Sequence, residues 1–250
     1  MQESATHIDA VAVLDGADAE WASVCLCVSG SVAAVKAPQL AAALLAHGVS
    51  VDIVLTDAAY TLLQASYRGE RPYAQLQALV AAATPGASDA RVARAADNND
   101  GVADGAALSA RRRPSLRLWR DADEWQSFET VGRDPVLHVE LAKRNQLLLI
   151  APLCANTLAC AACGLCHNLL GCVLRAWYYD LEPDFAEPIA ERYGAHVVQK
   201  PVLVAPAMNT FMWHQRVTGQ HLATLETRGP TSTIALEVTA SSSLPQRVRS

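Results

Sequence analysis

Charged residues are scarce in this chain. Asp, Glu, Lys and Arg make up 18% of the 250 residues, against 51% that are hydrophobic, so the chain can bury one sizeable core. This balance argues against a disordered protein. The 20 Lys and Arg and the 25 Asp and Glu give a net charge of -5, and residues 111–113 are the longest basic run. We therefore expect no nucleic-acid-binding surface.

The sequence also lacks the features of a secreted disulfide scaffold. Its beginning has no basic stretch followed by an apolar one, as a secretory leader would have. The seven cysteines are odd in number, and five of them lie between Cys154 and Cys172, whereas disulfide frameworks use even numbers of cysteines in short chains. We therefore expect a reducing, cytoplasmic setting.

Charge is absent altogether from residues 146–174, a stretch long enough to span a membrane. Asn156, Thr157 and His167 lie inside this stretch, and their polar groups would be costly to place in lipid. We therefore expect a buried strand followed by a buried helix, and no membrane span.

Short apolar runs alternate with helical segments along the chain. Residues 22–28 and 50–55 have the composition of buried strands, and the Ala- and Leu-rich residues 32–47 predict a helix between them. A strand, tight turn, helix and strand at this spacing form a βαβ unit. Further strands are predicted at 115–119, 146–150 and 201–205, and a further helix at 137–144. The sequence therefore predicts an α/β fold with a parallel sheet flanked by helices.

We expect a single domain over residues 21–228, with a flexible lead-in at 1–20 and an irregular tail at 229–250. Within the domain, residues 66–114 contain few large apolar side chains, and residues 178–200 are more charged than their surroundings. Both stretches are predicted to be surface insertions, and the first is predicted to be mobile.

Polar residues follow several predicted strands where the chain leaves the sheet. Ser-Gly-Ser at 29–31 ends a strand and opens a helix, so its N–H groups and hydroxyls could hold a phosphate, although it forms neither a G-x-G-x-x-G fingerprint nor a P-loop. The stretches 151–157 and 205–213 each place an Asn after Ala-Pro at a strand end. A ligand crevice at this edge and ordinary turn chemistry are both open as interpretations.

Cys160, Cys163 and Cys166 have a spacing at which thiolates can share a metal ion or an iron–sulfur cluster. A ferredoxin-type run would need a fourth cysteine at position 170, which is Leu170. On a helix, positions three apart lie on one face, where cysteine packs as a small hydrophobe. We favour core packing, with no metal site.

Five segments carry more specific patterns: Ser-Gly-Ser-Val-Ala-Ala at 29–34, Asp-Pro-Val-Leu-His-Val-Glu-Leu at 134–141, Ala-Pro-Leu-Cys-Ala-Asn-Thr-Leu at 151–158, Gly-Leu-Cys-His-Asn-Leu-Leu at 164–170 and Pro-Ala-Met-Asn-Thr-Phe-Met-Trp at 206–213. They resemble the phosphopantothenoylcysteine decarboxylases of the flavin-containing cysteine decarboxylase family. The resemblance covers residues 22–65 and 115–225. It implies a three-layer, flavodoxin-like Rossmann sheet, assembly as trimers, and FMN bound at the subunit interfaces.

The resemblance also implies roles for individual residues. Six of them match residues that contact FMN in the family: Gly30 and Ser31 at the phosphate, Thr56 at the end of the second strand, and Ala155, Asn156 and Thr157 in a loop along the flavin. His138 matches the active-site histidine, although a lone histidine in an apolar segment is more often structural. Asn209 matches the amide that grips the substrate carboxylate, and Met212 matches a residue of the substrate pocket.

The implied activity is the FMN-dependent decarboxylation of 4'-phosphopantothenoyl-L-cysteine to 4'-phosphopantetheine in coenzyme A biosynthesis. Oxidation of the cysteine moiety would give a thioaldehyde, whose C=S accepts electrons as carbon dioxide leaves. The enethiolate that remains must then be reduced and protonated.

One departure from the family's pattern concerns that last step. In the family, a cysteine downstream of the Met-Asn motif donates the final proton, but no cysteine follows Cys172 here, and residues 228–250 do not match that segment. Three explanations stay open: loss of the cysteine loop by truncation or mis-splicing, supply of the cysteine by a partner chain in a hetero-trimer, or a non-catalytic flavoprotein that regulates a protein phosphatase. We expect flavin binding in each case, and incomplete turnover by the isolated chain.

Overall fold

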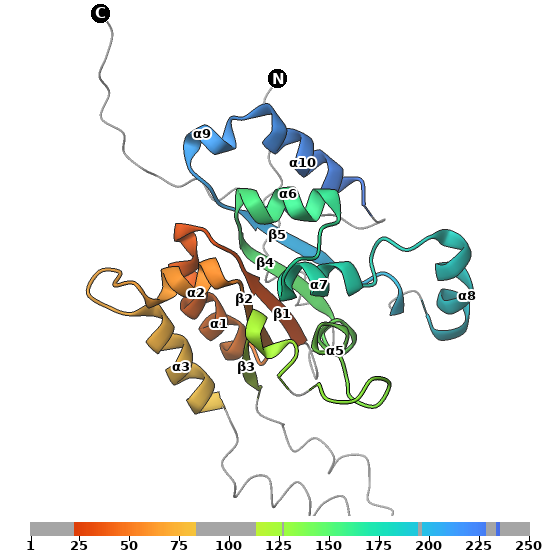
Figure 1. Ribbon diagram of the computed structural model, residues 1–250, viewed down its shortest axis with the longest axis horizontal. Helices are drawn as coiled ribbons and strands as arrows, with labels where there is room; N and C mark the ends of the chain where they lie inside the picture. The colour runs from red at the N-terminus through yellow and green to blue at the C-terminus, as the bar shows by residue number, and fades with distance from the viewer. Residues whose placement is uncertain (1–22, 84–113, 127, 195–196, 229–233, 236–250) are drawn as a thin grey trace, which may run out of the picture.

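The structure, a computed structural model, describes residues 23–83, 114–126, 128–194, 197–228 and 234–235 (Figure 1). Within these residues, six strands form one parallel sheet in the order β3-β2-β1-β4-β5-β6. The strands are β1 (Ser23–Val28), β2 (Ser50–Leu55), β3 (Leu116–Arg120), β4 (Leu147–Leu153), β5 (Val202–Pro206) and β6 (Ile234–Ala235). The order reverses between β1 and β4, and such a switch point is where open α/β sheets bind ligands.

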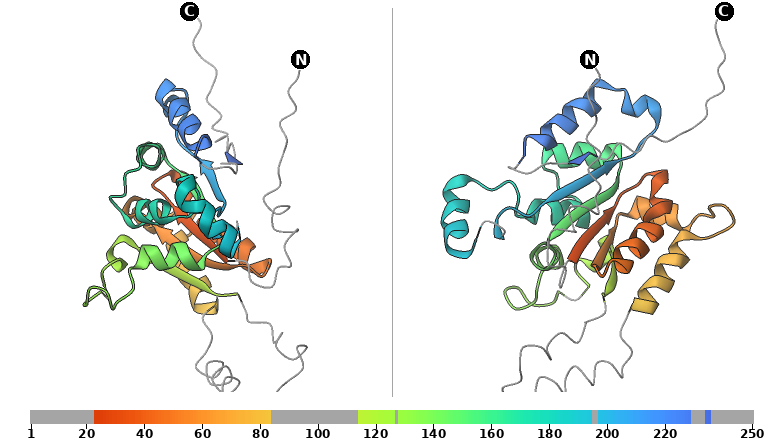
Figure 2. Two further views of the ribbon diagram at one scale, coloured as in Figure 1. Left: turned by 90° about the vertical axis from the view of Figure 1, so that its right-hand side faces the viewer. Right: turned by 180° about the vertical axis from the view of Figure 1, so that it is seen from behind.

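Helices cover both faces of this sheet. The 3-10 helix η1 (Val32–Lys36), α1 (Ala37–Ala46), α2 (Asp57–Gln64) and α3 (Pro72–Ala83) enclose a core on one face that includes Leu26 and Leu63. On the other face, α5 (Leu137–Arg144), α6 (Ala155–Cys163), α7 (Leu169–Ala176) and α10 (Arg216–Glu226) enclose a core that includes Leu148 and Leu158. The views in Figure 2 show the two layers on either side of the strands. The remaining elements are η2 (Asp121–Asp123), α8 (Pro183–Tyr193) and α9 (Thr210–Trp213). The predicted three-layer α/β fold is confirmed.

The strands are apolar along their length because helices cover both faces of the sheet. In β1, Cys25 and Cys27 join the core beneath α5 and α7, while Leu26 and Val28 join the core beneath α1 and α2. Successive side chains of a strand point to opposite faces, so a strand covered on both faces needs apolar residues throughout. Strand β4 lies between β1 and β5, as its uninterrupted apolar composition predicted.

Asp52 is a buried acidic residue of β2 that joins three parts of the fold. Its carboxylate accepts hydrogen bonds from Trp119 Nε1 at 2.9 Å, from Arg144 Nε and Nη2 at 2.8 and 2.7 Å, and from Asn145 Nδ2 at 3.0 Å. A buried carboxylate is tolerated when it is paired and hydrogen-bonded in this way. Asp52 therefore ties β2 to β3 and to the connection between α5 and β4.

The predicted surface insertion at 66–114 is wrong in its first part. Residues 72–83 form α3, and Leu76 is completely buried in the core beneath α1 and α2. The insertion predicted at 178–200 contains α8, which has no buried residue. Residues 84–113, the lead-in at 1–20 and most of the tail at 229–250 lie outside the described residues. In that tail, Ile234–Ala235 pairs with β5.

The uncharged stretch 146–174 forms β4, α6 and the first part of α7, and none of the helices that the structure describes is long and apolar enough to cross a membrane. Core packing of the cysteine run is wrong for Cys163 and Cys166, which are exposed, while Cys160 is partly buried. Cys166 lies beyond α6, which ends at Gly164 with a φ of 70°. Cys163 is on α6 but outside its buried face, which includes Leu158 and Ala161. In the described part of the chain, no three His, Cys, Asp or Glu residues are grouped so that they could hold a metal ion.

Candidate functional site

The carboxyl ends of β1, β2, β4 and β5 meet at one edge of the sheet, because all of these strands are parallel. A capping residue follows each of them: Ser31 before η1, Thr56 before α2, Cys154 before α6 and Asn209 before α9. Each of these side chains accepts a hydrogen bond from an N–H group in the first turn of its helix. The edge therefore collects helix N-termini, whose partial positive charge favours an anionic ligand.

The turn at 29–31 holds β1 against β4 at the switch point. The buried Ser29 Oγ donates to Pro152 O at 2.7 Å and accepts from Cys154 N at 2.7 Å. The backbone at Gly30 lies so close to α2 that a Cβ at this position would be 2.5 Å from Ala58 Cβ. Only glycine permits this approach. The turn therefore forms a tight cradle between the start of η1 and the start of α2.

The residues expected in a flavin-facing loop, Ala155, Asn156 and Thr157, form the first turn of α6 instead. Asn156 is exposed, whereas Thr157 is buried and its Oγ1 accepts from Cys154 Sγ at 3.3 Å. Burial raises the pKa of the Cys154 thiol, but hydrogen bonding with Ser29, Thr157 and the backbone of α6 outweighs this effect and lowers the pKa overall. Asn156 is thus the polar side chain of this turn that is open to a ligand.

Asn209 and Met212 lie at the end of β5. Asn209 Oδ1 accepts from Met212 N at 2.9 Å, so its Nδ2 is a donor that has no hydrogen-bond partner among the described residues. Asn209 is exposed, and the Met212 side chain, at 41% exposed, lies on the same short helix α9. This arrangement can hold a carboxylate beside an apolar surface.

His138 lies in the first turn of α5 and contacts Glu124, the residue that ends η2. His138 Nδ1 is 2.6 Å from Glu124 Oε1, and the two side chains are 24% and 7% exposed. A lone histidine in an apolar segment thus has a buried acidic partner. Such a pair is suited to proton transfer at the other ring nitrogen.

His138 and Asn209 lie on different elements. His138 is on α5, which packs against α7, whereas its partner Glu124 follows β3 and Asn209 follows β5. These strands are four positions apart in the order β3-β2-β1-β4-β5, which is about 19 Å at the usual strand spacing. The residues predicted to contact a flavin lie between them, around β1, β2 and β4.

Sequence comparison identifies the family of this chain. The family model described as Flavoprotein matches residues 16–242. This chain belongs to the Flavoprotein family.

The chain is also similar to individual curated proteins and solved structures. This Flavoprotein-family chain is 43% identical over 134 residues to a probable phosphopantothenoylcysteine decarboxylase of Arabidopsis thaliana, a match that covers 52% of this chain and 57% of the relative. The chain spans about half the length of the curated relatives that it matches. A solved mutant of PPC decarboxylase complexed with pantothenoylaminoethenethiol is 32% identical, with a TM-score of 0.50 over 82% of this chain and 76% of that one. The FMN binding protein AtHal3 is 32% identical, with a TM-score of 0.51 over 82% and 75%.

The sequence did not predict the contacts of two residues of the site. Ser29 was expected only as part of a turn that could hold a phosphate, but its side chain joins β1 to β4. Glu124 belongs to an acidic run and lies 14 residues before His138, a separation that corresponds to no regular spacing within a helix or strand. A single sequence therefore contains no pattern that predicts the contact between Glu124 and His138.

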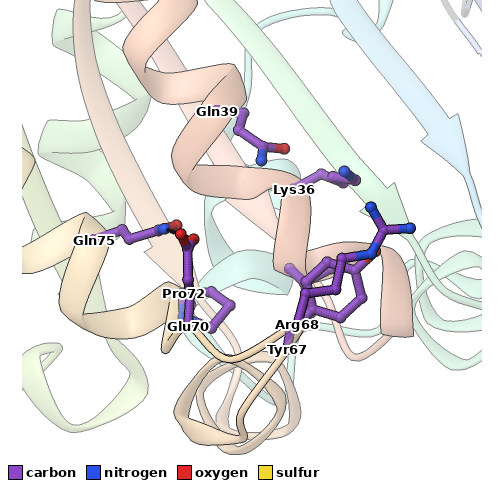
Figure 3. A pocket seen from close by; sticks show the side chains of 8 residues that line it. Lys36, Gln39, Tyr67, Arg68, Glu70, Pro72 and Gln75 are labelled. Atoms are coloured by element: carbon purple, nitrogen blue, oxygen red, sulfur yellow. Dashed lines mark hydrogen bonds between the residues drawn. The ribbon is translucent and has the colours of Figure 1, made fainter.

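A cavity of about 170 Å³ lies between η1, α1 and the turn before α3 (Figure 3). It is lined mainly by polar side chains: Lys36, Gln39, Tyr67, Arg68, Glu70 and Gln75. Lys36 and Arg68 lie over the Tyr67 ring, and Glu70 accepts a hydrogen bond from Gln75. None of the predicted site residues lines this cavity, so it is distinct from the carboxyl edge of the sheet.

Proposed function

We propose that this chain is an FMN-dependent decarboxylase of 4'-phosphopantothenoyl-L-cysteine, a carboxy-lyase of coenzyme A biosynthesis. The isolated chain oxidises and decarboxylates this substrate but does not complete the reduction to 4'-phosphopantetheine. The observation that carries the proposal is the carboxyl edge of the sheet, where the turn at 29–31, α2, α6 and Asn209 meet around the switch point. The similarity to PPC decarboxylases supports the substrate class, and the similarity to the FMN binding protein AtHal3 supports the cofactor.

The residues at this edge fit FMN. Gly30 and Ser31 supply a tight turn with N–H groups for the phosphate, and Thr56 begins α2 beside that turn. The exposed Asn156 at the start of α6 can contact the ring system. A bound FMN would supply the acceptor for the hydride equivalent that leaves the cysteine moiety, and the resulting thioaldehyde would allow carbon dioxide to depart.

The side chains of the chain bind and orient the substrate. Asn209 Nδ2 donates to the substrate carboxylate and fixes the direction of the carbon–carbon bond that breaks. Met212 forms an apolar wall beside it. His138 takes the proton of the substrate thiol as the C=S bond forms.

We further propose that the active unit is a cytoplasmic trimer, a homo-trimer or a hetero-trimer, in which His138 of one subunit and Asn209 of the next complete one site. The family resemblance, which implies FMN bound at the subunit interfaces, supports this arrangement. Within one chain, His138 lies on α5 and Asn209 precedes α9.

Two measurements test the proposed function. The purified chain reconstituted with FMN is expected to retain the flavin absorbance after gel filtration, and a colourless protein would refute flavin binding. With phosphopantothenoylcysteine, the FMN-loaded chain is expected to form the decarboxylated enethiol, which has two hydrogens fewer than phosphopantetheine. Mass spectrometry distinguishes the two products, and full conversion to phosphopantetheine would contradict the incomplete turnover.

The similarity to the FMN binding protein AtHal3 favours a second candidate, a non-catalytic flavoprotein that regulates a protein phosphatase. This alternative predicts that a phosphatase is retained by the immobilised chain. It also predicts that His138→Asn changes no measurable activity. Loss of flavin bleaching by substrate in His138→Asn decides for the decarboxylase.

A further inference from the structure

Glu124 and His138 form a carboxylate–imidazole pair whose geometry selects one form of the ring. Glu124 Oε1 lies 2.6 Å from His138 Nδ1, and the Glu124 side chain is only 7% exposed. A carboxylate has acceptor oxygens alone, so this hydrogen bond requires the proton on Nδ1. The neutral ring is then bare at Nε2, the nitrogen that can accept a proton.

The 3-10 helix η2 fixes the position of Glu124. Asp121 Oδ1 accepts from the backbone N–H of Leu169, the first residue of α7, at 2.9 Å. Glu124 N donates to Asp121 O at 3.3 Å. Helix α7 packs in turn against α5, which carries His138. These contacts close a ring of elements that holds the carboxylate at the imidazole.

The second carboxylate oxygen of Glu124 indicates that the Glu124–His138 pair has a role beyond packing. Glu124 Oε2 is buried and has no hydrogen-bond partner in the part of the chain that the structure describes. Leaving a buried polar atom unpaired is destabilising, and more so for a charged group. An unpaired buried atom of this kind therefore indicates a role beyond folding.

We propose that Glu124 is a positioning residue for His138: it fixes the Nδ1–H tautomer, directs Nε2 toward the substrate, and stabilises the imidazolium that forms. In this step the S–H bond of the substrate breaks, its proton passes to Nε2, and the C=S bond forms as a hydride equivalent leaves for the flavin. The kinetic part of this inference rests on the proposed function, whereas the tautomer does not.

The experiment compares the FMN-loaded chain with Glu124→Gln and Glu124→Asp. Long-range proton–nitrogen NMR spectra at alkaline pH, where the imidazole is neutral, show which ring nitrogen carries the proton, and His138→Asn identifies the signals of His138. We expect the Nδ1–H form in the unmodified chain and in Glu124→Asp. We expect a shift toward the Nε2–H form in Glu124→Gln, because an amide nitrogen can donate to a bare Nδ1.

Anaerobic stopped-flow bleaching of the flavin by phosphopantothenoylcysteine gives the kinetic readout. Glu124→Gln is expected to slow bleaching by about 10²- to 10⁴-fold with little change in KM, and Glu124→Asp is expected to recover part of this loss. Glu140→Gln is the control, because Glu140 lies on the same helix α5 and pairs with Lys143 at the surface. It is expected to change neither readout.

Two results would overturn the proposal: an unchanged tautomer in Glu124→Gln, or a changed tautomer with an unchanged bleaching rate. If the unmodified chain bleaches no flavin with this substrate, the proposed function fails. The NMR comparison then still decides whether Glu124 sets the state of the His138 ring.

Discussion

A subunit-mixing experiment tests whether His138 and Asn209 act in one chain or across two. The two variants are His138→Asn and Asn209→Asp, chosen to keep the local fold. An Asn amide can still donate to Glu124, so the carboxylate is not left unpaired. An Asp at position 209 still accepts from Met212 N, but it replaces the free amide donor by an oxygen that repels a substrate carboxylate.

The expected magnitude follows from the proposed assembly. In that assembly, each site takes His138 from one subunit and Asn209 from the next. Equal amounts of the two variants that assort at random in a trimer place an intact His138 and an intact Asn209 at about one quarter of the interfaces. The mixture should therefore recover about one quarter of the unmodified bleaching rate per flavin, although each variant alone is inactive.

The assay is co-refolding of the two variants with FMN, native mass spectrometry to confirm mixed trimers, and anaerobic flavin bleaching by phosphopantothenoylcysteine. A double variant that carries both changes is the control, because mixing it with either single variant restores no site. Mixed trimers that recover no activity would refute the shared site. They would show that His138 and Asn209 act within the same chain.

Three further predictions concern packing and titration. Gly30→Ala is expected to lower the free energy of unfolding by about 1–3 kcal/mol and to weaken FMN binding, because the added Cβ meets the Cβ of Ala58. Gly219→Ala is the control: nothing lies within 4 Å of its added carbon, so it should be neutral or slightly stabilising. Urea unfolding measures the stability of both variants, and FMN titration measures their cofactor binding. Asp52→Asn is expected to lower the free energy of unfolding by about 2–4 kcal/mol, because it removes the carboxylate that pairs with the partly exposed guanidinium of Arg144. A decrease of less than about 0.5 kcal/mol in urea unfolding would contradict this prediction. Burial raises the pKa of Cys172 to about 11, so about one molecule in a thousand carries its thiolate at pH 8, and alkylation by iodoacetamide should rise steeply above that pH. The lowered pKa of Cys154 predicts alkylation at lower pH than for Cys172, and peptide mass mapping across a pH series that finds the reverse order would contradict both assignments.

The strands and several helices could be predicted because their residues are dictated locally. The strand at Ser50–Leu55 and the helix at Leu137–Arg144 have the bounds that their composition predicted. Helix α3 could not be predicted, since it is held by tertiary packing: its sequence is a short Ala-rich segment whose one completely buried large side chain, Leu76, meets a core built from distant strands. The exposure of Cys166 was missed because the left-handed Gly164 was not recognised as the end of α6. The exposure of Cys163 was missed because the buried face of α6 is set by the elements packed against it, and Cys163 lies outside that face.

The residues that carry the family resemblance turn out to have folding roles as well. Ser31, Thr56 and Asn209 each cap a helix, so their side-chain oxygens are already engaged by backbone N–H groups. The groups left for a ligand at this edge are therefore backbone N–H groups, the hydroxyl protons of Ser31 and Thr56, the exposed Asn156 and the free Nδ2 of Asn209. A substitution that removes a cap changes the helix and the ligand contact together. Only changes that keep the capping oxygen, such as Asn209→Asp, separate recognition of the substrate from stability of the fold.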